Sequence, residues 1–210
     1  MTEKPRLVIA TTNPHKLEEF REIYTDLPYQ LVSPRDLGVT FEVEETGVTF
    51  EENAVLKALA CAEETGLLSL ADDSGLEIDA LGGEPGVYSA RWAGVGTPYP
   101  ERFRLLNERL GDHLDEERTA RYRCAVAIAE PAPRGLFDVV FGTFEGRIAR
   151  EPQGSGGFGY DPIFYVPERG VTVGQMTAEE KHSMSHRARA ANAARPMLAR
   201  LLDRGERFRA

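Results

Sequence analysis

The spacing of apolar residues predicts a strand followed directly by a helix at the start of the chain. A continuous apolar run over residues 6–11 indicates a buried strand, and apolar residues between Leu17 and Tyr24 recur at helical spacing. Asn13 is suited to the N-cap position and Pro14 to the first helical turn. We therefore expect the strand to enter the helix through a tight turn.

A second helix is predicted from a capping box. Thr49 is followed three residues later by Glu52, and the helical pattern continues to a stop at Gly66. Asn53 and Lys57 are four residues apart and therefore share one helix face. Lys57 stands in an apolar run, so it either extends along its aliphatic stem to solvent or reaches inward to an anion.

Two strand-like runs, residues 67–71 and 76–81, flank an acidic sequence that contains Asp72 and Asp73. Two carboxylates at the end of a buried strand are costly unless a cation lies beside them. That cation could be an arginine such as Arg91, or a metal that carries phosphates.

The second half of the chain contains further elements of both kinds. A helix is predicted over residues 101–114. Alternation over residues 119–130 places Tyr122 and Cys124 on one face of a strand, and alternation resumes over residues 137–141 after a proline- and glycine-containing turn, which indicates a β-hairpin.

The C-terminal region is predicted to hold two helices. A capping box at Thr177 begins the first, and residues 181–187 interrupt it. Ser185 can cap a second helix that runs to about Arg204, and Pro196 should kink or split that helix.

Composition restricts the class of protein. The chain has 210 residues, 41% of them hydrophobic, enough for one sizeable core that could fold as two lobes. The formal net charge of -9 argues against a general nucleic-acid or membrane surface. Two cysteines in apolar runs indicate reduced, buried thiols, and no apolar signal core or long apolar run occurs. We expect a soluble, cytoplasmic protein.

Any anionic ligand would need cations gathered locally, and lysines are candidates. The chain has 21 arginines but only four lysines, three of which are Lys16, Lys57 and Lys181. The compact charge of lysine suits a phosphate oxygen. Lys16 falls in the first turn of a predicted helix, where backbone N–H groups can bind an anion, although an ordinary strand–helix connection remains the alternative.

Two further segments carry candidate chemistry. The glycines of residues 154–159 contain G-x-G-x-x-G, but Pro162 and a strand-like run follow, so the dinucleotide-binding interpretation is rejected. The segment is either a ligand loop that exposes Phe158 or an ordinary hairpin loop. Near the C-terminus, four side chains able to contact a ligand occur within seven residues: Lys181, His182, His186 and Arg187.

Five segments in this order resemble the inosine/xanthosine triphosphate pyrophosphatase family and together cover nearly the whole chain. They are residues 11–16, residues 44–47 with 50–58, residues 71–76 with 85–91, residues 156–162 and residues 181–187. Thr12 departs from the Gly or Ser usual in that family. The resemblance implies a single domain over residues 1–210 with an α/β fold, in which a long, bent mixed β-sheet is flanked by helices and a cleft lies between two lobes.

The resemblance also implies a homodimeric, Mg2+-dependent enzyme that converts dITP, ITP and XTP to the monophosphate and pyrophosphate, which would remove deaminated purines from the nucleotide pool. Asp73 would be the catalytic carboxylate and a metal ligand, with Glu44 as the second ligand, although Glu45 in the same turn is not excluded, and Asp72 would support them. The substrate-binding residues would be Thr11, Thr12, Asn13, Pro14, His15, Lys16, Lys57, Ser74, Phe158, Gly159, Tyr160, Asp161, Lys181, His186 and Arg187.

Three alternatives remain from the sequence. The chain could be a related pyrophosphatase that acts on methylated or pyrimidine nucleotides. It could be a nucleotide- or RNA-binding module without turnover, although the acidic balance opposes RNA. The acidic pair could also serve only to form a salt bridge with an arginine.

Overall fold

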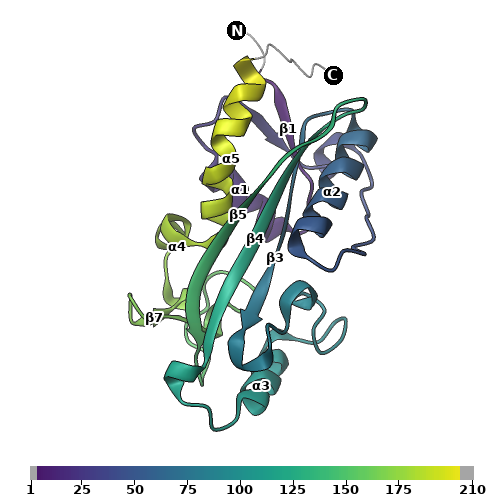
Figure 1. Ribbon diagram of the computed structural model, residues 1–210. Coiled ribbons are helices and arrows are strands. Elements are labelled where there is room, and N and C mark those ends of the chain that lie inside the picture. The colour runs from purple at the N-terminus through teal and green to yellow at the C-terminus, as the bar shows by residue number, and fades with distance from the viewer. Residues whose placement is uncertain (1–3, 204–210) are drawn as a thin grey trace. The chain divides into compact units, whose positions relative to one another are not determined.

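A computed structural model describes residues 4–203 and has a mixed α/β architecture (Figure 1). Seven strands form one sheet in the order β2-β1-β3-β4-β5-β6-β7. Strand β1 pairs in parallel with β2 and β3, whereas β6 pairs antiparallel with β5 and β7. The strands are β1 Arg6–Ile9, β2 Gln30–Val32, β3 Ser69–Ile78, β4 Thr119–Glu130, β5 Gly135–Ile148, β6 Phe164–Val166 and β7 Val171–Thr172. The helices are α1 Pro14–Ile23, α2 Phe50–Thr65, α3 Tyr99–Leu110, α4 Ala178–Met184 and α5 His186–Asp203. The expected α/β class with a mixed sheet is confirmed.

The chain divides into two compact units. Unit 1 comprises the residues up to 73, residues 124–142 and those from 188 onward, and unit 2 comprises residues 74–123 and 143–187. Strand β3 therefore passes from unit 1 to unit 2 after Asp73.

Unit 1 buries both faces of its strands. Leu7 and Ile9 of β1 belong to a core that includes residues of α1 and α5, whereas Val8 and Ala10 belong to a second core that includes alanines of α2. Alternate residues of a strand point to opposite faces, so a continuous apolar run is what a strand covered on both sides requires. In Figure 1, α2 accordingly lies on one side of these strands and α1 and α5 lie on the other.

Unit 2 has a separate core that includes aromatic residues from α3, β4, β5 and β6. Phe103, Tyr122 and Phe164 are members, and the Tyr122 and Phe164 rings stack with centroids 4.4 Å apart. This core holds the strands and the 3-10 turn, Asp161–Ile163, that carry the polar residues of unit 2.

The predicted caps are confirmed. Asn13 Oδ1 accepts hydrogen bonds from the backbone N–H groups of His15 and Lys16 at 3.0 and 3.4 Å. Thr49 caps α2, which ends at Gly66 with a left-handed φ of 66°. Thr177 and Glu180 form the capping box of α4.

Strand β3 differs from its prediction. It is one ten-residue strand, so the acidic pair lies inside a strand and not at the end of one. Strand alternation then sends Asp72 and Asp73 to opposite faces, where each finds a separate cationic partner. The last three residues of the second predicted run, Asp79–Leu81, form a 3-10 helix.

Two helices also differ from their predictions. Helix α3 begins at Tyr99 and ends at Leu110, before Gly111 adopts a positive φ of 49°. Helix α5 continues through Pro196, so it is not split there, and a kink at this proline stays a prediction. Buried alanines and leucines on both sides of that proline, including Ala194 and Leu198, hold the helix on the core and outweigh one lost backbone hydrogen bond. Arg204, where this helix was expected to end, lies outside the described residues.

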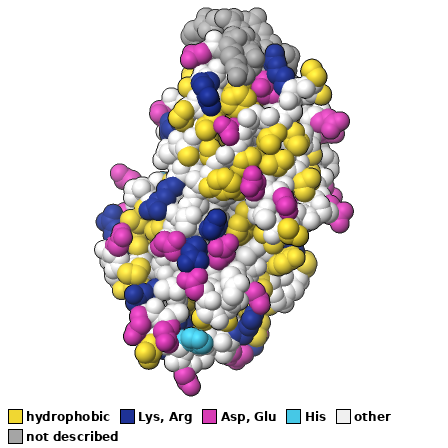
Figure 2. Space-filling view, viewed as in Figure 1, with side chains coloured by type: hydrophobic (Ala, Val, Ile, Leu, Met, Phe, Trp, Pro, Cys, Tyr) yellow, Lys and Arg dark blue, Asp and Glu magenta, His cyan; other side chains and the backbone are white. Residues whose placement is uncertain are grey.

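Three expectations concern the chain as a whole: membrane spans, the state of the cysteines and the distribution of surface charge. None of the helices within residues 4–203 is long and apolar enough to span a membrane. Neither Cys61 nor Cys124 forms a disulfide, and both are buried, as expected. On the face shown in Figure 2, acidic and basic side chains are intermingled over the described residues, without one large basic patch.

Candidate functional site

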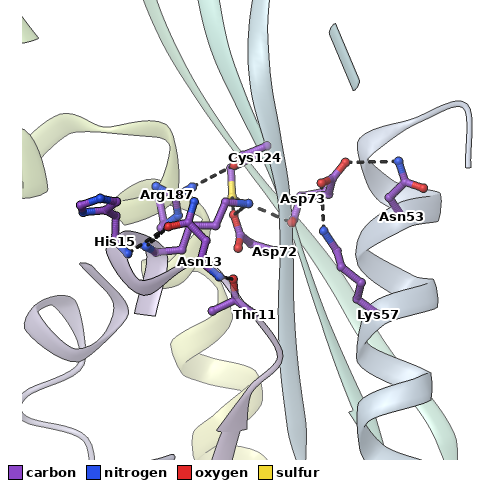
Figure 3. A network of polar contacts seen from close by, with 12 residues as sticks. Thr11, Asn13, His15, Asn53, Lys57, Asp72, Asp73, Cys124 and Arg187 are labelled. Carbon is purple, nitrogen blue, oxygen red and sulfur yellow. Dashed lines mark hydrogen bonds and ion pairs between the residues drawn. The ribbon is translucent and has the colours of Figure 1, made fainter. Parts of the chain in front are cut away.

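A buried carboxylate in β3 organises a polar group in unit 1. Asp73 is 6% exposed, and its two oxygens lie 2.9 Å from Lys57 Nζ and 3.3 Å from Asn53 Nδ2 (Figure 3). Lys57 Nζ also donates to Glu45 Oε1 at 2.7 Å. The helical spacing therefore does place Asn53 and Lys57 on one face, and Lys57 reaches inward to anions that belong to the protein itself.

Burial and charge oppose each other in this group. Burial raises the pKa of Asp73, and the positive charges of Lys57 and Lys16 lower that pKa only in part. Burial alone would lower the pKa of Lys57, but Asp73, Asp72 and Glu45 together raise it. Lys57 consequently stays protonated and holds two carboxylates close to one positive charge.

Asp72 occupies the opposite face of β3 (Figure 3). Its Oδ2 lies 2.9 Å from Lys16 Nζ, and the Cys124 Sγ lies 4.0 Å from the same oxygen. The side chain of Asp72 is only 1% exposed, so Lys16 compensates much of the cost of burying its charge.

The loop before α1 differs in detail from the expected anion site. Thr11 Oγ1 accepts from the Asn13 N–H at 3.1 Å, and the Asn13 side chain caps the N–H groups of His15 and Lys16. Those N–H groups are engaged within the loop, so the Lys16 side chain is the principal cationic donor that this turn presents.

A second polar group lies in unit 2 and centres on Asp161, which is 2% exposed. Its oxygens accept from Lys181 Nζ at 2.7 Å, Tyr122 OH at 3.0 Å and the Phe158 N–H at 2.8 Å. A Cβ on Gly157 would overlap Asp161 Oδ2, and Gly157 has a φ of 69°, so glycine allows this close approach.

Aromatic and cationic side chains extend this group. The Phe158 ring, which is half-buried, has Lys181 Nζ 4.8 Å and Arg187 Cζ 5.7 Å from its centroid. Arg187 Nη2 donates to Ser74 Oγ at 2.8 Å. His186 stacks on Tyr122 with ring centroids 4.6 Å apart.

The structure therefore gathers the candidate residues into one group in each unit. Asp73, Lys57, Lys16 and the Thr11–Lys16 turn belong to unit 1, whereas Ser74, the Phe158–Asp161 segment, Lys181, His186 and Arg187 belong to unit 2. Each of the three lysines singled out by composition pairs with an aspartate. Lysines accompany both carboxylates of the acidic pair, partners that the sequence analysis did not name for them, and a metal at this pair stays a prediction.

Sequence reasoning missed two members of these groups. Tyr122 was expected on the same strand face as Cys124, but nothing local indicated that its hydroxyl would bind Asp161. Glu45 was left undecided against Glu44; in the structure Glu45 contacts Lys57, whereas Glu44 is exposed. The positions of β4 and of the acidic turn in the fold decide these partners. The residues next to Tyr122 and Glu45 in the sequence do not indicate them.

The residues near Asp73 fit a Mg2+ ion. Among the described residues, no group of three or more His, Cys, Asp or Glu side chains could hold a metal by itself. Mg2+ is usually held by one or two carboxylates together with waters and substrate phosphates. Asp73 and Glu45, which converge on Lys57 Nζ, supply that number of oxygen ligands.

The protein thus combines an α/β fold with three buried aspartates, each of which is paired with a lysine. The model of the Ham1 family matches residues 7–197, so the chain belongs to the Ham1 family. It is 49% identical to a dITP/XTP pyrophosphatase of Desulforamulus reducens over 93% of this chain and 96% of that protein. It is 48% identical to a dITP/XTP pyrophosphatase of Bacillus subtilis over 86% and 90% of the two chains.

Solved structures agree with this assignment. A HAM1 protein from Coxiella burnetii matches with a TM-score of 0.83 and 41% identity, over 93% of this chain and 99% of that one. The Ham1 protein of Staphylococcus aureus matches with a TM-score of 0.81 and 41% identity, over 92% and 98%. The family resemblance seen in the sequence motifs is confirmed.

Proposed function

We propose that this protein hydrolyses dITP, XTP and ITP to the nucleoside monophosphate and pyrophosphate, and so removes deaminated purines from the nucleotide pool. The observation that carries the proposal is the buried Asp73 carboxylate, oriented by Asn53 and Lys57 beside a second carboxylate, Glu45. High similarity to dITP/XTP pyrophosphatases over most of the chain supports the reaction class.

The unit 1 residues would act on the triphosphate. Asp73 and Glu45 would hold Mg2+, which when bound supplies charge neutralisation and Lewis-acid polarisation of phosphate oxygens. Lys57 and Lys16 would exchange part of their contact with Asp73 and Asp72 for the negative triphosphate, and Ser74, the first residue of unit 2, would be a further hydrogen-bond donor. Asp73 would orient the water that attacks the α-phosphorus.

The unit 2 residues would recognise the base. Hypoxanthine and xanthine present an O6 acceptor and an N1–H donor, and Lys181 and Arg187 can donate to O6, with His186 beside them. Phe158 would stack on the purine, and Asp161 holds both Lys181 and the Phe158 backbone in place. Adenine would leave these donors unpaired, which is how such a site rejects it.

A substrate panel with pyrophosphate detection tests the proposal. We expect Mg2+-dependent release of pyrophosphate from dITP, XTP and ITP at much higher kcat/KM than from dATP, dGTP or dCTP, and complete loss with EDTA. Preferred turnover of a methylated or pyrimidine nucleotide would replace the substrate assignment. Binding without turnover of any nucleotide would refute the enzymatic assignment.

Asp73→Asn separates chemistry from folding. The amide has nearly the same shape, so we expect an unchanged circular dichroism spectrum and a kcat lower by about 10³-fold, since the carboxylate would act at the reacting phosphate. Near-normal turnover of this variant would remove Asp73 from the catalytic role.

Base recognition is tested by a pair of variants. Arg187→Ala should reduce the ITP-over-ATP ratio of kcat/KM by about tenfold or more, because it removes a donor to O6. Lys16→Ala should lower kcat/KM for both nucleotides alike, since Lys16 would meet the triphosphate, which both nucleotides share. Equal losses on both substrates in both variants would contradict this division.

A further inference from the structure

Outside the residues already discussed, unit 2 contains a buried arginine that ties together one long loop. Arg102 of α3 is 3% exposed and donates to four main-chain carbonyls. Its Nη1 lies 3.0 Å from Ser89 O and 2.8 Å from Ala90 O, and Nε and Nη2 lie 3.0 and 3.3 Å from Thr97 O and Gly94 O. The guanidinium thus holds both ends of residues 89–97.

This loop needs such a tie. Ala93 has a positive φ of 62°, which is unfavourable for a residue with a side chain, whereas the positive φ values of Gly94 and Gly96, 106° and 83°, suit glycine. The loop exposes the apolar side chain of Val95, while Trp92 is partly buried against the unit 2 core. The four hydrogen bonds from Arg102, together with the bond from Thr97 Oγ1 to Ala93 O at 2.7 Å, hold this conformation.

The same carbonyl connects the loop to the proposed base-recognition segment. Ser89 O, besides accepting from Arg102, accepts from Tyr160 OH at 2.9 Å. Tyr160 is 3% exposed and immediately precedes Asp161, which holds Lys181 and the Phe158 N–H. A shift of Ser89 would therefore be transmitted to Asp161 by one hydrogen bond and one peptide unit.

Two more contacts reinforce the link. The Arg102 Cζ lies 5.0 Å from the centroid of the Tyr99 ring, and Tyr99 meets the edge of Tyr160 with centroids 5.2 Å apart. Ser89 Oγ accepts from the Leu76 N–H at 2.8 Å, so Ser89 also fixes β3 two residues after Ser74. Arg102 therefore supports Tyr160 both through Ser89 and through Tyr99.

We propose that Arg102 is a positioning residue for base recognition, which sets the Phe158–Asp161 segment through Ser89 and Tyr160. The proposal rests on the function proposed above, because it assigns to Arg102 the placement of residues that would read the purine. Arg102 touches no substrate in this scheme, and its loss would affect the binding and selection of the base more than the chemical step.

The kinetic test uses Arg102→Gln with a matched control. Arg118 is another buried arginine of unit 2, 1% exposed, which donates to Ile148 O and the Asn107 side chain. Arg102→Gln should raise KM for dITP about tenfold and lower the dITP-over-dATP ratio of kcat/KM, with kcat changed less than about threefold. Arg118→Gln should lower the melting temperature while KM and selectivity stay near wild type.

Two more conservative variants test the positioning role even if Arg102→Gln folds poorly. Tyr160→Phe removes only the hydroxyl that bonds Ser89 O, and should raise KM in the same direction by about three- to fivefold. Arg102→Lys preserves the charge but cannot reach all four carbonyls, so it should fall between wild type and Arg102→Gln. Unchanged KM and selectivity in both Tyr160→Phe and Arg102→Lys would overturn the proposal.

A fluorescence measurement separates this inference from the proposed function. Trp92 is the single tryptophan of the chain and lies within the tied loop. Arg102→Gln should lower Trp92 fluorescence anisotropy in the absence of nucleotide, whereas Arg118→Gln should not. Lower anisotropy together with an inactive wild type would refute the proposed function alone. An active wild type with unchanged anisotropy and unchanged KM in Arg102→Gln would refute the positioning role alone.

Discussion

Individual side chains in this protein carry charge that burial makes costly. Asp72, Asp73 and Asp161 are all nearly buried, and each lies within 3 Å of a lysine nitrogen. Removal of one partner from such a pair leaves an uncompensated buried charge, which typically costs about 3–5 kcal/mol. A phosphate that competed for a lysine would keep the lysine charge compensated, but the buried aspartate would then need another cation beside it.

Glu45 and Glu44 offer a matched pair at this scale. Glu45→Gln should lower kcat/KM by about 10²-fold and raise the Mg2+ concentration needed for half-maximal activity, because it removes one of two oxygens expected to hold the metal. Glu44→Gln, at an exposed position one residue earlier, should change both quantities less than threefold. Magnesium titrations of pyrophosphate release would measure this, and the reverse order of effects would make Glu44 the ligand.

A glycine beside Asp161 gives a second prediction. Gly157 and Gly170 share a φ of 69°, but only at Gly157 would a Cβ overlap Asp161. Gly170→Ala should cost about 1 kcal/mol for the left-handed conformation alone. Gly157→Ala should cost about 1–3 kcal/mol more, since Asp161 must move, and should raise KM for dITP. Urea unfolding and steady-state kinetics of both variants measure this; equal destabilisation would contradict the close approach.

At the scale of the element, β3 and α2 supply most of the unit 1 chemistry. One strand delivers Asp72 and Asp73 to opposite faces, and one helix face presents Asn53 and Lys57 to the second of them. The Asn53 side chain also accepts from the Gly47 N–H at 2.8 Å, which ties the preceding acidic turn to the helix. The spacing of residues within regular elements therefore fixes the geometry at Asp73.

An ion pair between Asp79, which follows β3, and Arg121 of β4 predicts that the stability of the fold depends on pH. Arg121 binds both oxygens of Asp79 at 2.7 and 2.9 Å, and this hydrogen bonding lowers the pKa of Asp79 below its ordinary value of 3.8. A depressed carboxyl pKa stabilises the fold above pH 3.8, and the contribution disappears as pH falls through the lower, folded-state pKa.

Asp79→Asn should therefore reduce the free energy of unfolding at pH 7 by no more than about 1 kcal/mol, because this pair is largely exposed to solvent. The difference between wild type and variant should shrink as the pH is lowered below the ordinary carboxyl pKa. Urea unfolding across pH measures both quantities, with Arg121→Gln as a control that removes the same pair. A difference that grew in acid would have the wrong sign for a depressed pKa.

At the scale of the whole molecule, the acidic balance and the expected assembly matter most. A net charge of -9 disfavours the binding of phosphate-rich polymers to the whole surface. An anionic ligand would therefore bind where lysines lie close together. The family resemblance further predicts a homodimer. Sedimentation velocity at micromolar protein should give twice the chain mass, independent of nucleotide. A monomer at every concentration tested would contradict that prediction.

The sequence was sufficient for features that depend on neighbouring residues. Asn13, Thr49 and Thr177 cap helices where expected, because capping joins atoms two or three residues apart. The five motif segments also identified the family, since the order of the segments and their residue types can be read without knowing how the chain packs.

Tertiary packing decided which groups meet. The sequence suggested a break at the acidic pair, but β3 continues because strand pairing and burial on both faces outweigh the local preference of Asp, Ser and Gly for turns. The partners of Asp72, Asp161 and Arg102 come from distant positions or are main-chain carbonyls. A carbonyl is present in every residue and leaves no mark in the sequence, so the role of Arg102 depends on the folded chain.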